Sequence, residues 1–265
     1  MLAGGRVGRC RNIGRMSYAP HLTSAIPPVL LHQLPQRAAV CWPTRTALTV
    51  EGQHLSYADL QAQIERCAAG LQQLGLERGA SVVLYLDKRV ETVVASFAAP
   101  AAGAVLVPAN PLLKPTQVAH ILQDAGAQVL ITSAARLASL APVLGDCPDL
   151  RHVLCCDGDA PLAQAPVPAG MALHAWHGVL ASGPAAAPTV LDGDVAMIFY
   201  TSGSPGLPKG VVLSHRNLVA GATSVASYLR NHAEDTLLAV LPLSFDAGFS
   251  QLTTAFLVGA RVVLL

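Results

Sequence analysis

The sequence predicts an α/β protein with mostly parallel sheets flanked by helices. Segments with apolar residues at helical spacing alternate with short, continuous apolar runs, which is the pattern of buried parallel strands joined by helices. The 265 residues are 52% hydrophobic and 12% charged, so apolar material suffices for a sizeable core and disorder is disfavoured. A formal net charge of +1 indicates neither nucleic acid nor an anionic membrane as a partner.

The first half of the chain shows this alternation most clearly. In residues 57–75, Leu60, Ile64 and Leu71 recur at helical spacing, and Gly75 stands where a helix commonly ends. The segments expected next are a strand at 81–86, a helix at 88–99, a strand at 104–107, a helix at 115–125, a strand at 128–132, a helix from 134 and a strand at Arg151–Cys155. We therefore expect a first α/β subdomain over residues 29–160, preceded by a poorly ordered, Arg-rich extension over residues 1–28.

A change in composition separates this part from the second half. Residues 161–191 contain no Asp, Glu, Lys or Arg and many Ala, Pro and Gly, which predicts an irregular linker. A partial second α/β subdomain is expected over 192–265. Its expected elements are a strand at 195–200, a strand at 211–213, a helix at 216–229 capped by Ser214, a strand at 237–241, a helix at 247–257 and a strand beginning at Arg261.

The loop between the first two of these strands has the composition of a polyphosphate-binding site. Residues 200–211 read YTSGSPGLPKGV, a short loop with three Ser or Thr hydroxyls, three glycines and one lysine, Lys209. Glycines let backbone N–H groups approach phosphate oxygens, hydroxyls donate hydrogen bonds, and a lysine supplies positive charge. The alternative interpretation is a surface loop rich in turn formers. A P-loop is disfavoured because Gly210, and not Ser or Thr, follows the lysine and because a strand, and not a helix, comes next.

The segment resembles the phosphate-binding loop of the adenylate-forming superfamily, which holds AMP-dependent acyl-CoA synthetases, luciferases and the adenylation domains of peptide synthetases. Four further segments are similar to core motifs of that superfamily. These are HLSYADL at 54–60, APAAGAVLVPANP at 99–111, SHRNL at 214–218 and LPLSFDAGF at 241–249. The resemblance covers the chain from about residue 30 to its last residue, and it implies the large N-terminal α/β domain of such an enzyme, in incomplete form.

The resemblance also implies a reaction and a set of site residues. The family joins a carboxylic acid to AMP from ATP, releases pyrophosphate, and passes the acyl group to a thiol of coenzyme A or of a carrier pantetheine. A small carboxylic acid and an acyl-carrier protein are therefore the expected partners. The implied phosphate contacts are Thr201, Ser202, Gly203, Ser204 and Gly206, and Lys209 would neutralise the departing pyrophosphate as the catalytic residue. Pro205 replaces the usual small hydroxyl residue and removes one N–H donor.

Three residues are implied on the acid side of the site. The Phe245–Asp246 pair is similar to the pair with which amino-acid-activating members bind a substrate ammonium, whereas acyl-CoA synthetases commonly have a histidine at the position of Phe245. Asp246 could instead cap the following helix. His215 is a third candidate for the pocket lining, with a polar residue at a helix start as its alternative. Acyl-CoA synthetase chemistry and amino-acid activation thus both stay open.

The expected mechanism needs parts that no motif of this chain supplies. Relatives have, further along, an acidic Mg²⁺ ligand, an aspartate that binds ribose, a hinge and a small C-terminal domain with a lysine that assists adenylation. We therefore expect a truncated enzyme with little or no ligase activity of its own. The alternative of another class is a non-catalytic remnant that binds nucleotide weakly or binds another protein.

The remaining features predict a cytoplasmic chain without structural metal or disulfide. No C-x-x-C pair occurs among the six cysteines, and Cys155–Cys156 is interpreted as packing at a strand end. His174 and His177 have no further metal-ligating residue near them in sequence and are interpreted as loop residues. Residues 92–113 lack charge, but their prolines predict a helix, a turn and a buried strand in place of a membrane span.

Overall fold

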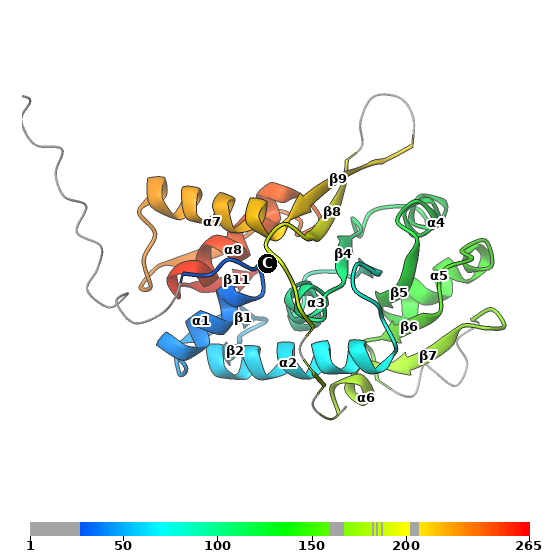
Figure 1. The fold of residues 1–265 in the computed structure, drawn as a ribbon, viewed down its shortest axis with the longest axis horizontal. Coiled ribbons are helices and arrows are strands. Elements are labelled where there is room, and N and C mark those ends of the chain that lie inside the picture. Colours follow the sequence, from blue (N-terminus) through cyan, green and yellow to red (C-terminus); the bar gives the residue numbers. More distant parts are fainter. Residues whose placement is uncertain (1–26, 159–166, 182, 184, 187, 202–206) are drawn as a thin grey trace, which may run out of the picture.

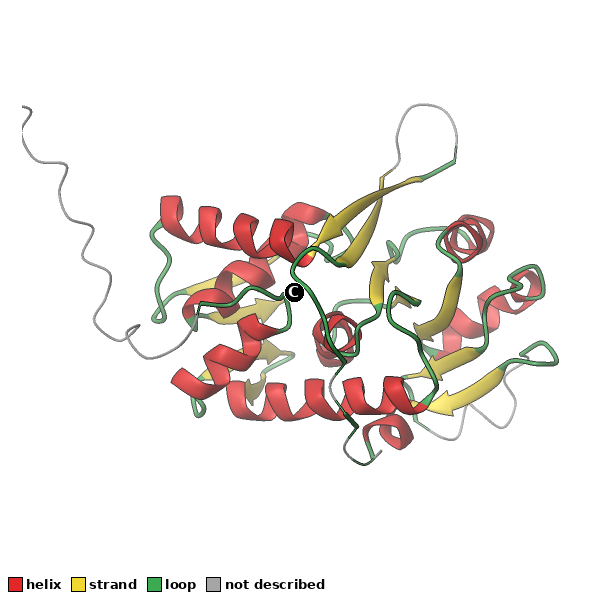
Figure 2. Ribbon diagram, in the orientation of Figure 1, coloured by secondary structure: helices red, strands yellow, loops and turns green. Residues whose placement is uncertain are grey.

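The computed structural model describes residues 27–158, 167–181, 183, 185–186, 188–201 and 207–265. The strands in these ranges form two sheets, here named the large sheet and the small sheet (Figures 1 and 2). The large sheet has seven strands in the order β7-β6-β5-β3-β4-β8-β9, and the small sheet has four in the order β10-β11-β1-β2. The expected α/β class with mostly parallel strands is confirmed. Nearly all of the expected N-terminal extension lies outside the described residues.

The large sheet is parallel except at one edge. Its strands are β3 (Ser81–Tyr85), β4 (Val105–Pro108), β5 (Ala127–Thr132), β6 (His152–Cys155), β7 (Ala172–Ala175), β8 (Val195–Thr201) and β9 (Lys209–Ser214). Only β9 runs antiparallel to its neighbour, β8. All residues of β3 and β4 are buried, as expected for parallel strands covered on both faces.

The small sheet combines strands from both ends of the chain. It contains β1 (Thr46–Val50), β2 (Gln53–Ser56), β10 (Thr236–Ala239) and β11 (Arg261–Leu264). Strand β11 lies between β10 and β1 and pairs with both in parallel. The β1–β2 turn places Glu51 at φ 48° and Gly52 at φ 80°, and positive φ at both positions suits a two-residue hairpin turn.

Helices form one layer between the sheets and another outside the large sheet. The inner layer and its flanks comprise α1 (Gln33–Cys41), α2 (Tyr57–Gln73), α3 (Val90–Ala101), α7 (His215–Leu229) and α8 (Asp246–Val258), and the outer layer comprises α4 (Pro115–Asp124) and α5 (Ala134–Leu144). Figure 1 shows α3 almost end-on between the two sheets. There Phe97 of α3 contacts Phe249 and Phe256 of α8, with ring centroids 5.8 and 5.3 Å apart. One continuous apolar core therefore joins the two sheets through these helices.

Residues 161–191 differ from the expected irregular linker. They include β7 and a short helix, α6 (Trp176–Leu180). Strand β7 pairs in parallel with β6, so main-chain hydrogen bonds define it in spite of its composition. The loop interpretation of His174 and His177 is wrong for the same reason, because His174 lies in β7 and His177 in α6.

The strands do not divide at the expected subdomain boundary. Strands β8 and β9 follow the expected linker but complete the large sheet, whereas β10 and β11 join β1 and β2 in the small sheet. Each sheet therefore draws strands from both sides of residues 161–191. Composition marks that stretch, but pairing partners distant in sequence decide which sheet a strand joins.

Residues 92–113 form most of α3, the following turn and β4, as predicted. Among the described residues, the model contains no helix with the length and apolar character needed to cross a bilayer. The five described cysteines are free thiols, and Cys155 and Cys156 are buried at the end of β6, which confirms the packing interpretation.

Candidate functional site

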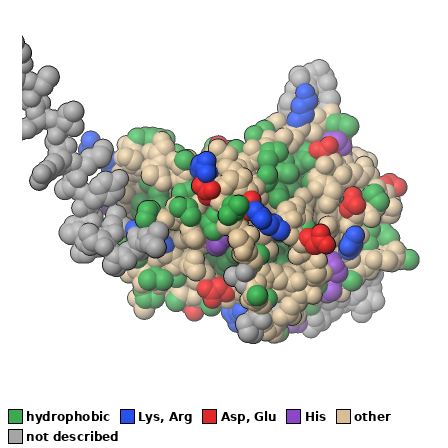
Figure 3. Space-filling model, viewed as in Figure 1, with side chains coloured by type: hydrophobic (Ala, Val, Ile, Leu, Met, Phe, Trp, Pro, Cys, Tyr) green, Lys and Arg blue, Asp and Glu red, His purple; other side chains and the backbone are tan. Residues whose placement is uncertain are grey.

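The β8–β9 hairpin carries the motif that predicted a phosphate loop. The two strands pair in antiparallel register up to Thr201 opposite Lys209. The hairpin projects from the edge of the large sheet, and a basic side chain is visible on it (Figures 1 and 3). Thr201 and Lys209 are both exposed at this end. The other predicted phosphate contacts, Ser202, Gly203, Ser204 and Gly206, lie outside the described residues.

Helix α4 supports the hairpin at the base of the loop. The Tyr200 hydroxyl donates a hydrogen bond to the Asp124 carboxylate at 2.6 Å, and His120 Nε2 lies 3.2 Å from the carbonyl oxygen of Pro208. Burial, followed by the contact with Asp124, raises the pKa of Tyr200, so its hydroxyl remains a donor. These contacts were missed from sequence because Asp124 and His120 lie about eighty residues away and belong to no motif.

Gly210 allows the hairpin to close over its own aromatic residue. A Cβ at this position would lie 2.7 Å from Ile198 Cγ2 and 3.4 Å from the Tyr200 ring. Gly210 is paired with Tyr200 across the two strands. The glycine therefore makes room first for Ile198 and also lies against the tyrosine that ties the hairpin to α4, a role separate from any contact with phosphate.

The hairpin end can bind an anion. Residues directly opposite each other in an antiparallel pair project from the same face, with Cβ atoms about 5 Å apart. The Thr201 hydroxyl can donate a hydrogen bond, and the exposed Lys209 ammonium offers three donors and a positive charge. Both groups can therefore reach one phosphate chain, and charge-assisted hydrogen bonds of this kind contribute about 1.5–3 kcal/mol each.

His215 lies in the interior, beside the N-terminal segment. Ser214 caps α7 as predicted, since its hydroxyl accepts a hydrogen bond from the Asn217 amide. His215 is 1% exposed, its Nδ1 accepts a hydrogen bond from the Leu31 amide at 3.0 Å, and its ring meets His32 edge-on. His215 is thus a polar residue at the helix start, as the alternative expected, but its ring is buried and joins α7 to the segment before α1.

Phe245 and Asp246 lie at the start of α8, and both are exposed. Phe245 occupies the cap position without a side-chain cap bond, and Asp246 is the first helical residue. The capping interpretation of Asp246 is therefore wrong. A carboxylate in the first helical turn is still favourable because the helix dipole places partial positive charge there. The predicted contact between these residues and a substrate stays a prediction.

A pocket of about 380 Å³ lies where the carboxyl ends of strands from both sheets meet. Its walls include Leu86 and Lys88 after β3, Pro108 at the end of β4, Ser244 before α8, and Leu265 after β11. Ligands of open α/β sheets commonly bind beyond the carboxyl ends of strands. His215 is not among the lining residues, and neither are Phe245 and Asp246.

The described residues contain no group of three or more His, Cys, Asp or Glu side chains that could hold a metal ion. The exposed hydroxyl and ammonium of the hairpin, in contrast, suit the oxygen atoms of a triphosphate.

Comparison with known proteins places these features in a family. The chain matches the family model described as AMP-binding enzyme over residues 35–265. It is 36% identical to 4-coumarate–CoA ligase 5 of Oryza sativa subsp. japonica over 72% of this chain and 34% of the relative. It is 32% identical to L-proline–[L-prolyl-carrier protein] ligase of Pseudomonas fluorescens over 89% of this chain and 45% of that protein.

A solved structure agrees with this placement. The Mycobacterium tuberculosis fatty acyl CoA synthetase superposes with a TM-score of 0.70 at 28% identity, over 89% of this chain and 45% of that one. The chain thus spans less than half of the length of each of these three relatives. With its two mixed, mostly parallel sheets and its projecting hairpin, the chain belongs to the AMP-binding enzyme family of adenylate-forming ligases.

Proposed function

We propose that the chain carries the phosphate-binding part of an adenylate-forming active site of the acyl-CoA synthetase type. The observation that supports this proposal best is the β8–β9 hairpin, which ends in exposed Thr201 and Lys209 around the Gly- and Ser-rich loop sequence. Tyr200 and Pro208, on either side of the loop, contact α4, so the two ends of the loop are held in place. The site takes ATP as substrate together with a carboxylic acid.

The proposed reaction has two steps. A carboxylate oxygen attacks the α-phosphorus of ATP, the bond to the β-phosphate oxygen breaks, and pyrophosphate leaves with the bonding electrons. A thiolate of coenzyme A or of a carrier pantetheine then attacks the acyl carbon of the acyl-adenylate and releases AMP. Because charge accumulates on phosphate oxygens, catalysis depends on positioning and charge stabilisation.

In this proposal the chain's own residues act on the phosphates. Thr201 donates a hydrogen bond to a phosphate oxygen, and the loop residues Ser202, Gly203, Ser204 and Gly206 provide further donors. Lys209 offsets the charge of the departing pyrophosphate. Mg²⁺ would neutralise charge on the same phosphates, with protein ligands from outside the described residues. The free cysteines fit the reducing cytoplasm in which we place this activity.

Titration calorimetry of the 265-residue chain with ATP and Mg²⁺ tests the binding part of the proposal. We expect weak binding, and Lys209→Ala should weaken it about tenfold because one charge-assisted contact is lost. Lys114→Ala serves as the matched control, since Lys114 is an exposed lysine at the start of α4 and is not one of the proposed phosphate contacts. Absence of binding heat with the wild-type chain would contradict the proposal and support the non-catalytic remnant.

A second candidate, activation of an amino acid, is favoured by the exposed Asp246 at the start of α8. The relatives include both kinds of enzyme, a CoA ligase and a ligase for L-proline and its carrier protein. ATP–pyrophosphate exchange by a full-length relative with the same Phe-Asp pair separates them. Exchange that depends on amino acids and is lost when this aspartate is changed to asparagine would favour the second candidate.

A further inference from the structure

Lys88 joins the two sheets through main-chain oxygens. It follows β3 of the large sheet, and its ammonium donates to the main-chain oxygens of Ala239 at 2.7 Å, Val240 at 2.9 Å and Leu265 at 3.0 Å. These oxygens lie at the carboxyl ends of β10 and β11, which are adjacent parallel strands of the small sheet. An ammonium group has three donors, so Lys88 uses all of them on the backbone of the other sheet.

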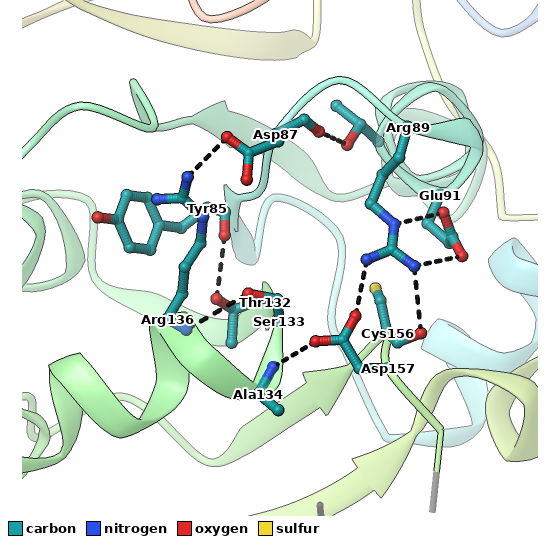
Figure 4. Close-up of polar contacts among 11 residues, drawn as sticks. Tyr85, Asp87, Arg89, Glu91, Thr132, Ser133, Ala134, Arg136, Cys156 and Asp157 are labelled. Carbon is teal, nitrogen blue, oxygen red and sulfur yellow. Dashed lines mark hydrogen bonds and ion pairs between the residues drawn. The ribbon is translucent and has the colours of Figure 1, made fainter. Parts of the chain in front are cut away.

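The loop that bears Lys88 is fixed on both sides. Figure 4 shows the ion pairs at this edge of the large sheet: Asp87 accepts a 2.7 Å contact from Arg136, and Arg89 binds Glu91 and Asp157, both at 2.7 Å. Asp157 also accepts a hydrogen bond from the Ala134 amide at the start of α5. The residues before and after Lys88 are therefore tied to α3, α5 and the end of β6, and Lys88 projects from a rigid support.

The residues held by Lys88 lead directly to the predicted acid-side pair. Residues 240–246, here named the acid-side segment, run from the end of β10 to the first residue of α8. Gln251 of α8 donates to the Leu238 carbonyl at 3.0 Å, just before the segment. On the other side lies the pocket of about 380 Å³, lined by Pro242, Leu243 and Ser244 together with Lys88. Packing on that side is thus incomplete, and the buried Ser244 hydroxyl finds no hydrogen-bond partner among the described residues.

We propose that Lys88 is a positioning residue that holds the acid-side segment in a fixed place relative to the large sheet, and hence to the phosphate hairpin. The naming of the segment rests on the proposed function, whereas the positioning rests on the contacts of Lys88 alone. In this arrangement the lysine replaces the apolar packing that the pocket leaves out. Its loss lets the segment move without unfolding either sheet.

Hydrogen exchange with mass spectrometry on the 265-residue chain tests the positioning. In Lys88→Met, which keeps an aliphatic stem of similar length, peptides covering 236–249 should exchange about tenfold faster. Peptides covering 127–155, in β5, α5 and β6, should stay close to wild type. Lys88→Arg retains donors and should restore most of the protection, and Lys114→Met is the control for loss of a lysine elsewhere. Unchanged exchange at 236–249, or equal acceleration in all peptides, would overturn the proposal.

A binding measurement separates this inference from the proposed function. Calorimetry with ATP and Mg²⁺ should give nearly equal dissociation constants for wild type and Lys88→Met, because the hairpin does not touch Lys88. Where pyrophosphate exchange is measurable with hexanoate, benzoate or L-proline, the KM for the acid should rise about tenfold in Lys88→Met, with little change in the KM for ATP. A wild-type chain that binds no ATP contradicts the proposed function. The hydrogen-exchange result for Lys88→Met still decides whether Lys88 positions the acid-side segment.

Discussion

The β8–β9 hairpin and the region from β10 to α8 both carry predicted ligand residues, but the structure holds them in different ways. At the loop end of the hairpin, Tyr200 and Pro208 meet α4, and further back β8 pairs with β4 and Phe199 contacts Phe249 of α8. The β10–α8 region is restrained repeatedly, by Lys88 at the end of β10 and by α8 itself. Phosphate binding by backbone N–H groups needs room around a loop, whereas selection among acids needs side chains on a fixed support.

The largest effect that can test this comparison is expected at Gly248, in the first turn of α8. A Cβ at this position would overlap the carbonyl oxygen of Pro242, so the acid-side segment packs directly on the bare helix backbone. Gly248→Ala should therefore lower the free energy of unfolding by about 3 kcal/mol, since a backbone contact cannot easily move aside. Urea denaturation followed by circular dichroism measures the change.

Gly221 in α7 provides the matched control. A Cβ there meets nothing within 4 Å, and the position is exposed in a helix interior. Gly221→Ala should therefore stabilise the protein by about 0.5–1 kcal/mol. A similar response of both variants would mean that α8 and the acid-side segment are not packed as described.

Much of this architecture follows from local sequence, and the exceptions have a common cause. The spacing of Leu60, Ile64 and Leu71 predicts α2, and the continuous apolar runs predict β3 to β6, because periodicity and burial are local signals. Strand β7 escapes prediction because its definition comes from pairing with β6 and not from its own composition.

Among the candidate site residues, the same distinction holds. The phosphate loop is visible as a motif, and the cap at Ser214 follows from residue type. The burial of His215 depends on Leu31, 184 residues earlier. The hydrogen bonds of Lys88 depend on main-chain oxygens about 150 residues later or more. Such contacts leave no local pattern in a single sequence.

The next largest effect is the pH dependence of stability that comes from His32 and His215, where the hairpin continues into α7. Burial, and then the proximity of His215, lowers the pKa of His32 from 6.5 to about 4, and burial also lowers the pKa of His215. Between pH 6.5 and 4 the unfolded chain therefore binds a proton at His32 and the folded chain does not, and the lowered pKa of His215 acts in the same direction. The contribution of His32 is therefore complete above pH 6.5 and falls as the pH drops toward 4, by about 3 kcal/mol.

Urea titrations at several pH values between 7 and 4 measure this slope. His32→Phe keeps a ring next to His215 and removes one titrating group, so its stability should fall less steeply over the same range. His54→Phe is the control, because His54 lies on the exposed β2 strand. An equal slope in wild type and His32→Phe would show that His32 is protonated at its ordinary pKa in the folded protein.

The smallest effect tests how far the contact with α4 holds the loop end of the hairpin. Tyr200→Phe removes the hydrogen bond to Asp124 while keeping the ring that packs across Gly210. Because Asp124 is exposed and can turn to water, the loss of global stability should be only about 1 kcal/mol. Local opening should rise more, with faster amide exchange in peptides covering 195–201 and 209–214 and unchanged exchange in 236–249.

Tyr85→Phe is a matched control, since its hydroxyl donates to the Leu113 carbonyl, away from the hairpin. Equal protection of the hairpin in Tyr200→Phe and wild type would mean that strand pairing and the core packing of β8 hold it without the contact to α4, and the contrast between the two ligand regions would then rest on the restraints of α8 and Lys88.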